Sequence, residues 1–230
     1  MHKIDIPEEL VARIVGRRGR LHLFDAIEGR RTAHLVVDLQ LGFMAPGQPA
    51  EIAAAREIVP NVNRISAALR AAGGLVVYLQ HTVDAEGRAG WDNWYRAFSH
   101  PERRQRLDAV FGAGGSGHAL WPDLEVGPED LRVPKRRFSA FIPGSSNLHE
   151  TLQARGIDTL IVSGTATNTC CESTARDAAM MNYKVFFAAD ATATHTDAEH
   201  NATLANMIAQ FADVSTTEEI VALLAPDGTG

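Results

Sequence analysis

Short apolar runs, each ending in polar or glycine residues, recur along the chain. The clearest are HLVVDL (His34–Leu39), LVVYLQ (Leu75–Gln80), TLIVSG (Thr159–Gly164) and KVFFAAD (Lys184–Asp190). Continuous apolar runs of this length are typical of strands buried on both faces, as in a parallel sheet. LRVPKRR is a weaker fifth candidate, and its Pro134 suits an edge strand or the end of a strand.

Helical patterns lie between these runs. PNVNRISAALRAAGG repeats apolar residues at helical spacing and ends near Gly73. NLHETLQARG offers Asn147 as an N-cap and Gly156 as a stop, and THTDAEHNATLANMIAQF opens with Thr196 and Glu199 as a capping box. Alternation of strands and helices predicts an α/β fold with one doubly wound, mostly parallel sheet.

The stretch from about residue 84 to residue 130 breaks this alternation. It holds all three tryptophans, Trp91, Trp94 and Trp121, and the glycine-rich GAGGSG (Gly112–Gly117). A long excursion within a compact α/β domain is usually a lid or an oligomer contact. A dinucleotide-binding loop should leave a strand and enter a helix, whereas GAGGSG leads into HALWPD, so we interpret it as a flexible loop.

Composition and charge narrow the class of protein. The 230 residues carry a formal net charge of −6, which argues against a nucleic-acid or anionic-membrane partner. No apolar run is long enough to span a bilayer, and MHKIDIPEELVARIVGRRGR lacks the apolar core of a signal peptide. The two cysteines, if unpaired, fit a reducing compartment. We expect a cytoplasmic protein with one domain over residues 31–230, after an N-terminal extension of residues 1–30.

Three residues of chemical interest follow predicted strands. Asp38 closes HLVVD, Lys135 follows LRVP, and Cys170 follows TLIVSG across the turn TATNT. Ligands of parallel α/β sheets bind beyond the carboxyl ends of the strands, so we expect these side chains to converge there. Each also has a structural interpretation, because an aspartate often caps a turn, a lysine is often solvated, and a free cysteine is often a small buried hydrophobe.

The chemistry of these three groups suits acyl transfer to sulfur. Cys170 is predicted to open a helix, where free N–H groups and the helix dipole favour thiolate, and the Lys135 ammonium would lower the thiol pKa further. Asp38 would take the thiol proton and later return it to a leaving group. Backbone N–H groups in the turn ahead of Cys170 would receive a developing oxyanion.

Three segments of the chain resemble the signature segments of isochorismatase-like cysteine hydrolases. They are HLVVDLQLGFMAPG, VPKRRFSAF and LIVSGTATNTCCESTARDAAMMNYKVFFAADATAT, and the similarity runs from about His34 to Val221. The resemblance implies a three-layer, Rossmann-like α/β/α fold and a catalytic triad of Asp38, Lys135 and Cys170.

The same resemblance implies finer details of the site. A cis peptide is expected between Thr165 and Ala166, with the amides of Ala166 and Cys170 forming an oxyanion hole. Cys171 takes a position that the family usually gives to a small apolar residue, so it should be an inert buried thiol. The family usually forms dimers or tetramers, which implies a homo-oligomer here.

The family contains several activities, and they imply different substrates. Its amidases act on nicotinamide, maleamate, and carbamoyl or ureido compounds, whereas true isochorismatases cleave a vinyl ether without needing a cysteine. A complete triad favours the amidases. The metal site of nicotinamidases needs a second histidine near His81, which this sequence lacks, so nicotinamide is disfavoured and no metal or other cofactor is expected. HTDAEH (His195–His200) straddles a helix start and is assigned capping and surface roles.

Several further residues are candidate substrate contacts, although aromatic residues in such numbers are more often core or subunit contacts. They are Gln40, Phe43, His81, Trp91, Arg137, Phe141 and Asn168, with Trp94 and Phe138 as additional aromatic candidates. The sequence therefore predicts a cysteine-dependent hydrolase that cleaves a C–N bond of a small amide or ureido compound through a thioester. The alternatives are vinyl-ether hydrolysis and non-catalytic binding of a small molecule.

Overall fold

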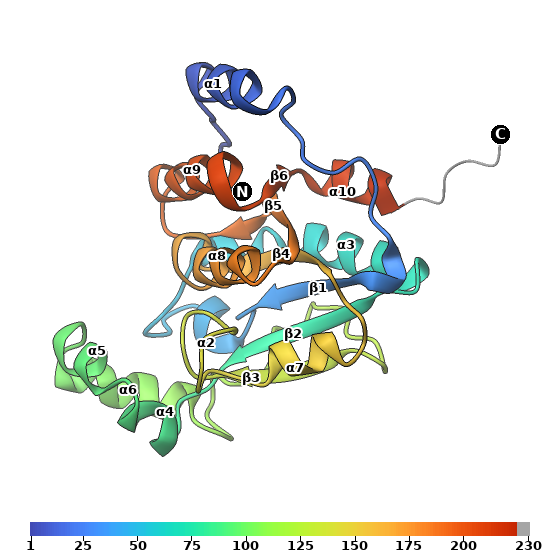
Figure 1. Ribbon diagram of the computed structural model, residues 1–230. Coiled ribbons are helices and arrows are strands. Elements are labelled where there is room, and N and C mark those ends of the chain that lie inside the picture. Colours follow the sequence, from blue (N-terminus) through green and yellow to red (C-terminus); the bar gives the residue numbers. More distant parts are fainter. Residues whose placement is uncertain (225–230) are drawn as a thin grey trace.

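A single parallel sheet organises the computed structural model, which describes residues 1–224. Within those residues the sheet has six strands in the order β3-β2-β1-β4-β5-β6, and all neighbouring pairs are parallel (Figure 1). The strands are β1 (Thr32–Val37), β2 (Leu75–His81), β3 (Leu131–Lys135), β4 (Thr159–Thr165), β5 (Lys184–Ala193) and β6 (Asp213–Ser215). The predicted doubly wound α/β fold is confirmed, and the sheet is entirely parallel.

All five apolar runs form strands, including the weak fifth candidate. LRVPKRR gives β3, which lies at one edge of the sheet. Pro134 is tolerated there because an edge strand needs hydrogen bonds on one side only. The sequence did not predict β6, because its three residues, Asp213, Val214 and Ser215, are too short and too polar to form an apolar run.

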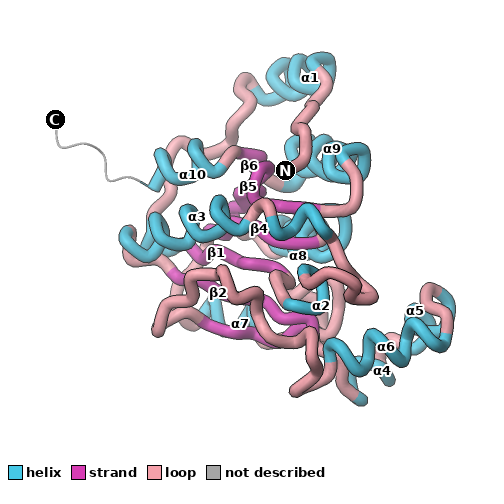
Figure 2. The backbone as a smooth tube through the Cα atoms, turned by 180° about the vertical axis from the view of Figure 1, so that it is seen from behind, coloured by secondary structure: helices cyan, strands magenta, loops and turns pink. Residues whose placement is uncertain are grey.

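Helices cover both faces of the sheet and bury one core on each. The helices are α1 (Glu8–Arg18), α2 (Leu41–Met44), α3 (Val59–Ala71), α4 (Ala85–Ala89), α5 (Asp92–Ala97), α6 (Pro101–Phe111), α7 (Leu148–Gln153), α8 (Glu172–Met180), α9 (Asp197–Asn206) and α10 (Thr217–Leu224). Helices α7, α8 and α9 lie on the face seen in Figure 1, and α3 and α10 lie on the face seen in Figure 2.

Successive side chains of one strand point alternately into the two cores. Leu35 and Val37 of β1 face the core under α7 and α8, whereas Val36 faces the core under α3 and α10. Side chains of a strand point alternately to opposite faces, so a strand with helices on both sides must be apolar throughout. The apolar runs in the sequence are continuous because helices cover both faces of the sheet.

The predicted helix ends are confirmed at α9 and wrong in part at α7. Thr196 Oγ1 accepts a hydrogen bond from Glu199 N (3.2 Å) and caps α9. Asn147 makes no side-chain cap at α7, because Ser146 Oγ accepts from Leu148 N (3.1 Å) instead. Gly156 lies just after α7 and has a φ of +67°, as expected of a glycine that terminates a helix.

The excursion at residues 84–130 is partly helical and extends away from the sheet. Helices α4, α5 and α6 form an arm beyond the ends of β2 and β3 (Figure 1). The glycine-rich stretch after α6 then returns to the body, where Gly42 N donates to Gly117 O (2.9 Å) and Trp121 N donates to Leu39 O (2.9 Å). The stretch that follows the arm thereby lies against the segment that follows β1.

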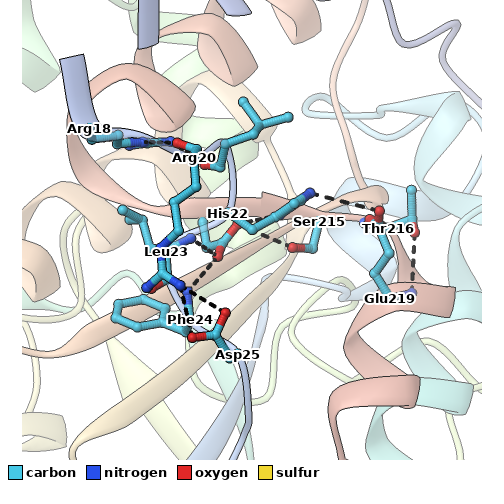
Figure 3. Close-up of polar contacts among 11 residues, drawn as sticks. Arg18, Arg20, His22, Leu23, Phe24, Asp25, Ser215, Thr216 and Glu219 are labelled. Atoms are coloured by element: carbon cyan, nitrogen blue, oxygen red, sulfur yellow. Dashed lines mark hydrogen bonds and ion pairs between the residues drawn. The ribbon is translucent and has the colours of Figure 1, made fainter. Parts of the chain in front are cut away.

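The N-terminal extension is tied to the other edge of the sheet, at β6. The buried carboxylate of Asp213 accepts hydrogen bonds from His22 Nδ1 (2.8 Å), Leu23 N (2.6 Å) and Phe24 N (3.1 Å), in the region shown in Figure 3. Ile14 of α1 is buried in the core that α8 and α9 cover. No helix within residues 1–224 is long and apolar enough to cross a membrane.

The order of the strands reverses its direction at the centre of the sheet, between β1 and β4, which is a topological switch point. From β1 the chain adds β2 and β3 on one side and then returns to add β4, β5 and β6 on the other. The carboxyl ends of β1 and β4 are neighbours there, with Val37 paired to Gly164. Ligand sites of doubly wound sheets lie at this point.

Glycine is required at position 164 by close approach of the two central strands. Gly164 has a φ of +111°, and a Cβ atom on it would collide with the carbonyl oxygen of Val37. We predict that Gly164→Ala lowers the free energy of unfolding by about 2–5 kcal/mol, because it adds overpacking to backbone strain.

Gly156→Ala is the matched control for this substitution. Gly156 also has a positive φ, but no atom lies within 4 Å of its added Cβ, so the expected loss is about 1–2 kcal/mol. Urea unfolding followed by circular dichroism measures both values. Equal losses would show that the contact with Val37 is unimportant.

Candidate active site

The sheet register brings Asp38 and Lys135 to the same edge. Asp38 directly follows Val37 of β1, which pairs with Leu79 of β2, and Lys135 ends β3 beside His81 of β2. The Lys135 side chain therefore reaches across the end of β2. Its Nζ lies 2.7 Å from Asp38 Oδ2, and both side chains are fully buried.

The backbone of Asp38 turns sharply out of the strand. Its φ of +52° is in the left-handed region, which aspartate tolerates better than most residues. Asp38 N donates to Leu79 O (3.0 Å), so the residue is still fixed to β2. The Asp38 carboxylate thereby meets Lys135, at the end of β3.

Three groups surround the Asp38 carboxylate. The Lys135 ammonium pairs with it, and the Cys170 thiol and the backbone of His81 lie within hydrogen-bonding reach of it. Lys135 also donates to Arg137 O (3.1 Å). Burial raises the pKa of Asp38 above its usual value, and the Lys135 ammonium only partly opposes this. A buried carboxylate with a raised pKa is a stronger proton acceptor than an ordinary one.

Lys135 stays protonated in this environment. Burial acts to lower its pKa, but the Asp38 carboxylate and the hydrogen bonds with Asp38 and Cys170 together act more strongly, and the net direction is upward. The charge on Lys135 is therefore a fixed part of the site.

Cys170 lies in a widened helical turn, the cysteine turn (Thr167–Cys171), that precedes α8. Ala166 O accepts from both Thr169 N (3.1 Å) and Cys171 N (3.1 Å), so the N–H of Cys170 is left out of this bond. A π-type turn of this kind is frequent at functional sites. The peptide bond between Thr165 and Ala166 is cis.

The two adjacent cysteines have different surroundings. Cys170 lines a cavity and is 5% exposed, whereas Cys171 is fully buried in the core and its Sγ contacts Ser163 O at 3.8 Å. Consecutive residues of a helical turn point in directions about 100° apart, which separates the two thiols. Cys171 is buried, as predicted.

The expected lowering of the Cys170 pKa is wrong. Burial raises the pKa of the thiol, the Lys135 ammonium opposes this, and the negative charge of Asp38 adds to it. Desolvation of a thiolate outweighs the favourable position near a helix start and beside an ammonium. Burial therefore favours the thiol over the thiolate at this position.

The cavity beside Cys170 has a volume of about 200 Å³, which suits a small molecule. Residues from the body and from the arm share its wall, so the excursion contributes directly to the site. The lining consists of Phe43, Ala50, Ile52, His81, Val83, Trp94, Tyr95, Arg103, Leu107, Phe111, Phe138, Ala166, Thr169, Cys170 and His195.

Two of the seven predicted substrate contacts, Phe43 and His81, line this cavity, as do the additional candidates Trp94 and Phe138. Burial lowers the pKa of His81 to about 3, so its imidazole is neutral. Within residues 1–224 its Nδ1 has no hydrogen-bond partner. No group of three or more His, Cys, Asp or Glu side chains in that range is arranged to hold a metal.

The other five candidates do not line the cavity. The Gln40 side chain is hydrogen-bonded to the β2 backbone. It accepts from His81 N (2.7 Å) and donates to His81 O (3.2 Å). Arg137 donates to Gly87 O (3.0 Å), and its guanidinium lies 5.4 Å from the centre of the Trp91 ring.

Phe141 packs against Tyr183, with the ring centres 5.6 Å apart. Asn168 accepts a hydrogen bond from the Thr194 hydroxyl at 2.7 Å. Both side chains therefore hold the structure around the site together.

Among the lining residues that the sequence did not predict, Arg103 and His195 are of chemical interest. Arg103 belongs to α6, where PERRQR is a pattern typical of a solvated helix surface. His195, which is assigned a capping or surface role, is exposed and also lines the cavity from the loop between β5 and α9. Neither position carries a local signal, because both reach the cavity only through the folding of distant segments.

Comparison with known proteins agrees with this architecture. Residues 32–219 match the family described as Isochorismatase domain. The ureidoacrylate amidohydrolase RutB of Variovorax paradoxus is 35% identical over 214 residues, covering 87% of this chain and 84% of that protein. The ureidoacrylate amidohydrolase RutB of Pseudomonas savastanoi pv. phaseolicola is 30% identical over 238 residues, covering 98% of this chain and 95% of that protein.

Solved structures show the same fold. A cysteine hydrolase from Pseudomonas syringae pv. phaseolicola 1448A superposes with a TM-score of 0.76 at 28% identity, covering 88% of this chain and 96% of the other. The N-carbamoylsarcosine amidase of Thermoplasma acidophilum, at 22% identity, has a TM-score of 0.65 over 82% of this chain and 97% of its own. The chain belongs to the isochorismatase family, in its amidohydrolase branch, and is a hydrolase of non-peptide C–N bonds.

Proposed function

We propose that this protein hydrolyses a small ureido or carbamoyl acid through a covalent thioester on Cys170. The observation that carries the proposal is the contact of Cys170, which lines the small cavity, with the buried Asp38–Lys135 pair. The names of the relatives, ureidoacrylate amidohydrolases, make ureidoacrylate the first compound to test.

The first half of the reaction forms the acyl enzyme. Asp38 accepts the proton of the Cys170 thiol, and the sulfur attacks the carbonyl carbon of the substrate. As the C–N bond breaks, Asp38 returns the proton to the leaving nitrogen. The acyl group is then bound to sulfur, as a thiocarbamate when the substrate is a ureide.

The second half releases the product. Asp38 takes a proton from water, the oxygen adds to the acyl carbon, and the C–S bond breaks with return of the proton to sulfur. Lys135 holds the Asp38 carboxylate in place during both halves. The amides of Ala166 and Cys170 receive the oxyanion at each addition step, and the exclusion of Cys170 N–H from the Ala166 O bond supports this role.

The positive charge of Arg103 in the cavity lining supports a substrate that carries a carboxylate. Among the residues that line the cavity it is the one with a permanent charge, and no aspartate or glutamate lines it. Arg103 donates to Ser99 Oγ (3.4 Å) and Pro49 O (3.2 Å) and makes no ion pair within residues 1–224. An unpaired guanidinium favours a carboxylate ligand, so a carboxylate on the substrate would bind at this side of the cavity.

Cys170→Ala tests the nucleophile. We predict that it abolishes release of ammonia from ureidoacrylate, because no other thiol of the described residues reaches the cavity. Cys171→Ala is the matched control and should keep at least half of the wild-type rate. Loss of activity in Cys171→Ala alone would reverse the assignment, and pyruvate release from isochorismate that survives Cys170→Ala would favour vinyl-ether hydrolysis.

Asp38→Asn tests the proton acceptor. The substitution keeps the size of the side chain but removes its basicity, so kcat should fall by about 10²–10⁴-fold. Stopped assays with purified enzyme measure kcat, and circular dichroism verifies that the variant is folded. A kcat within threefold of wild type would exclude Asp38 as the base.

Arg103→Gln tests the recognition of an acid. KM for ureidoacrylate should rise by about 10-fold or more, because a charge-assisted hydrogen bond contributes roughly 1.5–3 kcal/mol, while hydrolysis of the corresponding neutral amide should be unchanged. Arg106→Gln, on the same helix but outside the cavity, is the control. An equal effect on both substrates would refute carboxylate binding by Arg103.

A further inference from the structure

His2, near the start of the chain, is buried against the loop that carries His195. Its side chain is 6% exposed. Its Nδ1 lies 2.8 Å from Asp197 Oδ1, and its Nε2 lies 3.0 Å from Thr194 N and 3.1 Å from Thr194 O. One imidazole therefore holds both ends of the connection between β5 and α9.

Neighbouring residues fix the segment around His2. Asn201 of α9 accepts from Asp5 N (2.8 Å) and donates from its Nδ2 to Lys3 O (2.8 Å). Both views of the fold place the N-terminus beside α9 (Figures 1 and 2). The segment before α1 is thus attached to α9 by its backbone as well as by His2.

Two contacts connect His2 to the cysteine turn. The His2 ring stacks on His200, with ring centres 4.6 Å apart, and His200 Nδ1 lies 3.0 Å from Thr167 Oγ1. The Thr194 hydroxyl donates to Asn168 Oδ1 at 2.7 Å. Thr167 and Asn168 begin the turn that holds Cys170, so His2 is two contacts away from the thiol-bearing turn by either route.

The charges around His2 suit this arrangement. Asp197 accepts from one ring nitrogen, and His200 stacks on the ring face. Burial, aided by repulsion from His2, lowers the pKa of His200 to about 4. His200 is neutral at physiological pH, so the two stacked rings do not repel as two cations.

We propose that His2 is a positioning residue for the active site. By fixing the Thr194–Thr196 loop and His200, it sets the place of His195 in the cavity wall and of Cys170 in the cysteine turn. The inference rests on the proposed function for its kinetic readout only. Small displacements of reacting groups reduce rates strongly, so loss of His2 should act on kcat.

The test compares His2→Ala with Lys3→Ala, using protein whose N-terminus carries no tag. We expect His2→Ala to lower kcat by about 10-fold with KM nearly unchanged. Lys3→Ala should behave as wild type, because the hydrogen bond of Lys3 to α9 comes from its backbone oxygen. His2→Gln, whose amide can replace Nε2 at Thr194, should restore most of kcat, whereas His2→Asn should not.

The outcomes separate positioning from general destabilisation. An unchanged kcat in His2→Ala overturns the proposal, and so does a loss that Gln fails to restore and that follows a lowered Tm. If wild-type enzyme hydrolyses no ureido acid, the proposed function fails, but the positioning role is still measurable in a Cys171→Ala background. There, His2→Ala should speed alkylation of Cys170 by iodoacetamide several-fold, and an unchanged rate would refute positioning.

Discussion

The buried contact between Asp38 and Lys135 is the interaction on which the active site depends. Removing two charges from water costs several kcal/mol for each ion, and mutual attraction seldom returns more than this. The pair is therefore better explained by chemistry than by stability. It needs three strands in register, because the Asp38 turn after β1 and the Lys135 end of β3 meet only across the end of β2.

The same desolvation determines how the thiol is used. A thiolate in this cavity would have to be stabilised against burial, and the Lys135 ammonium does so only in part. In the proposed mechanism Asp38, whose pKa burial raises, is the base that takes the proton of this thiol. The proposed mechanism therefore begins from the thiol and not from the thiolate.

Much of the fold and the three central residues could be predicted from the sequence. Continuous apolar runs indicated the strands, because helices cover both faces of the sheet. Positions at strand ends indicated Asp38, Lys135 and Cys170, because the carboxyl ends of parallel strands lie together. The direction of the Cys170 pKa was not predictable, since depth of burial is a property of the whole fold. Arg103 and His195 were missed because only the folding of the arm and of the β5–α9 loop brings them to the cavity.

The division of the cavity wall between body and arm has a consequence for how the activity can change over evolution. The Asp38 turn and the cysteine turn follow the packed central strands, where an added methyl group at Gly164 already meets the Val37 backbone. The arm contributes Trp94, Tyr95, Arg103, Leu107 and Phe111 to the wall while extending away from the sheet. Substitutions there can exchange one substrate for another without disturbing the reacting groups, so the specificity of the enzyme can evolve separately from its chemistry.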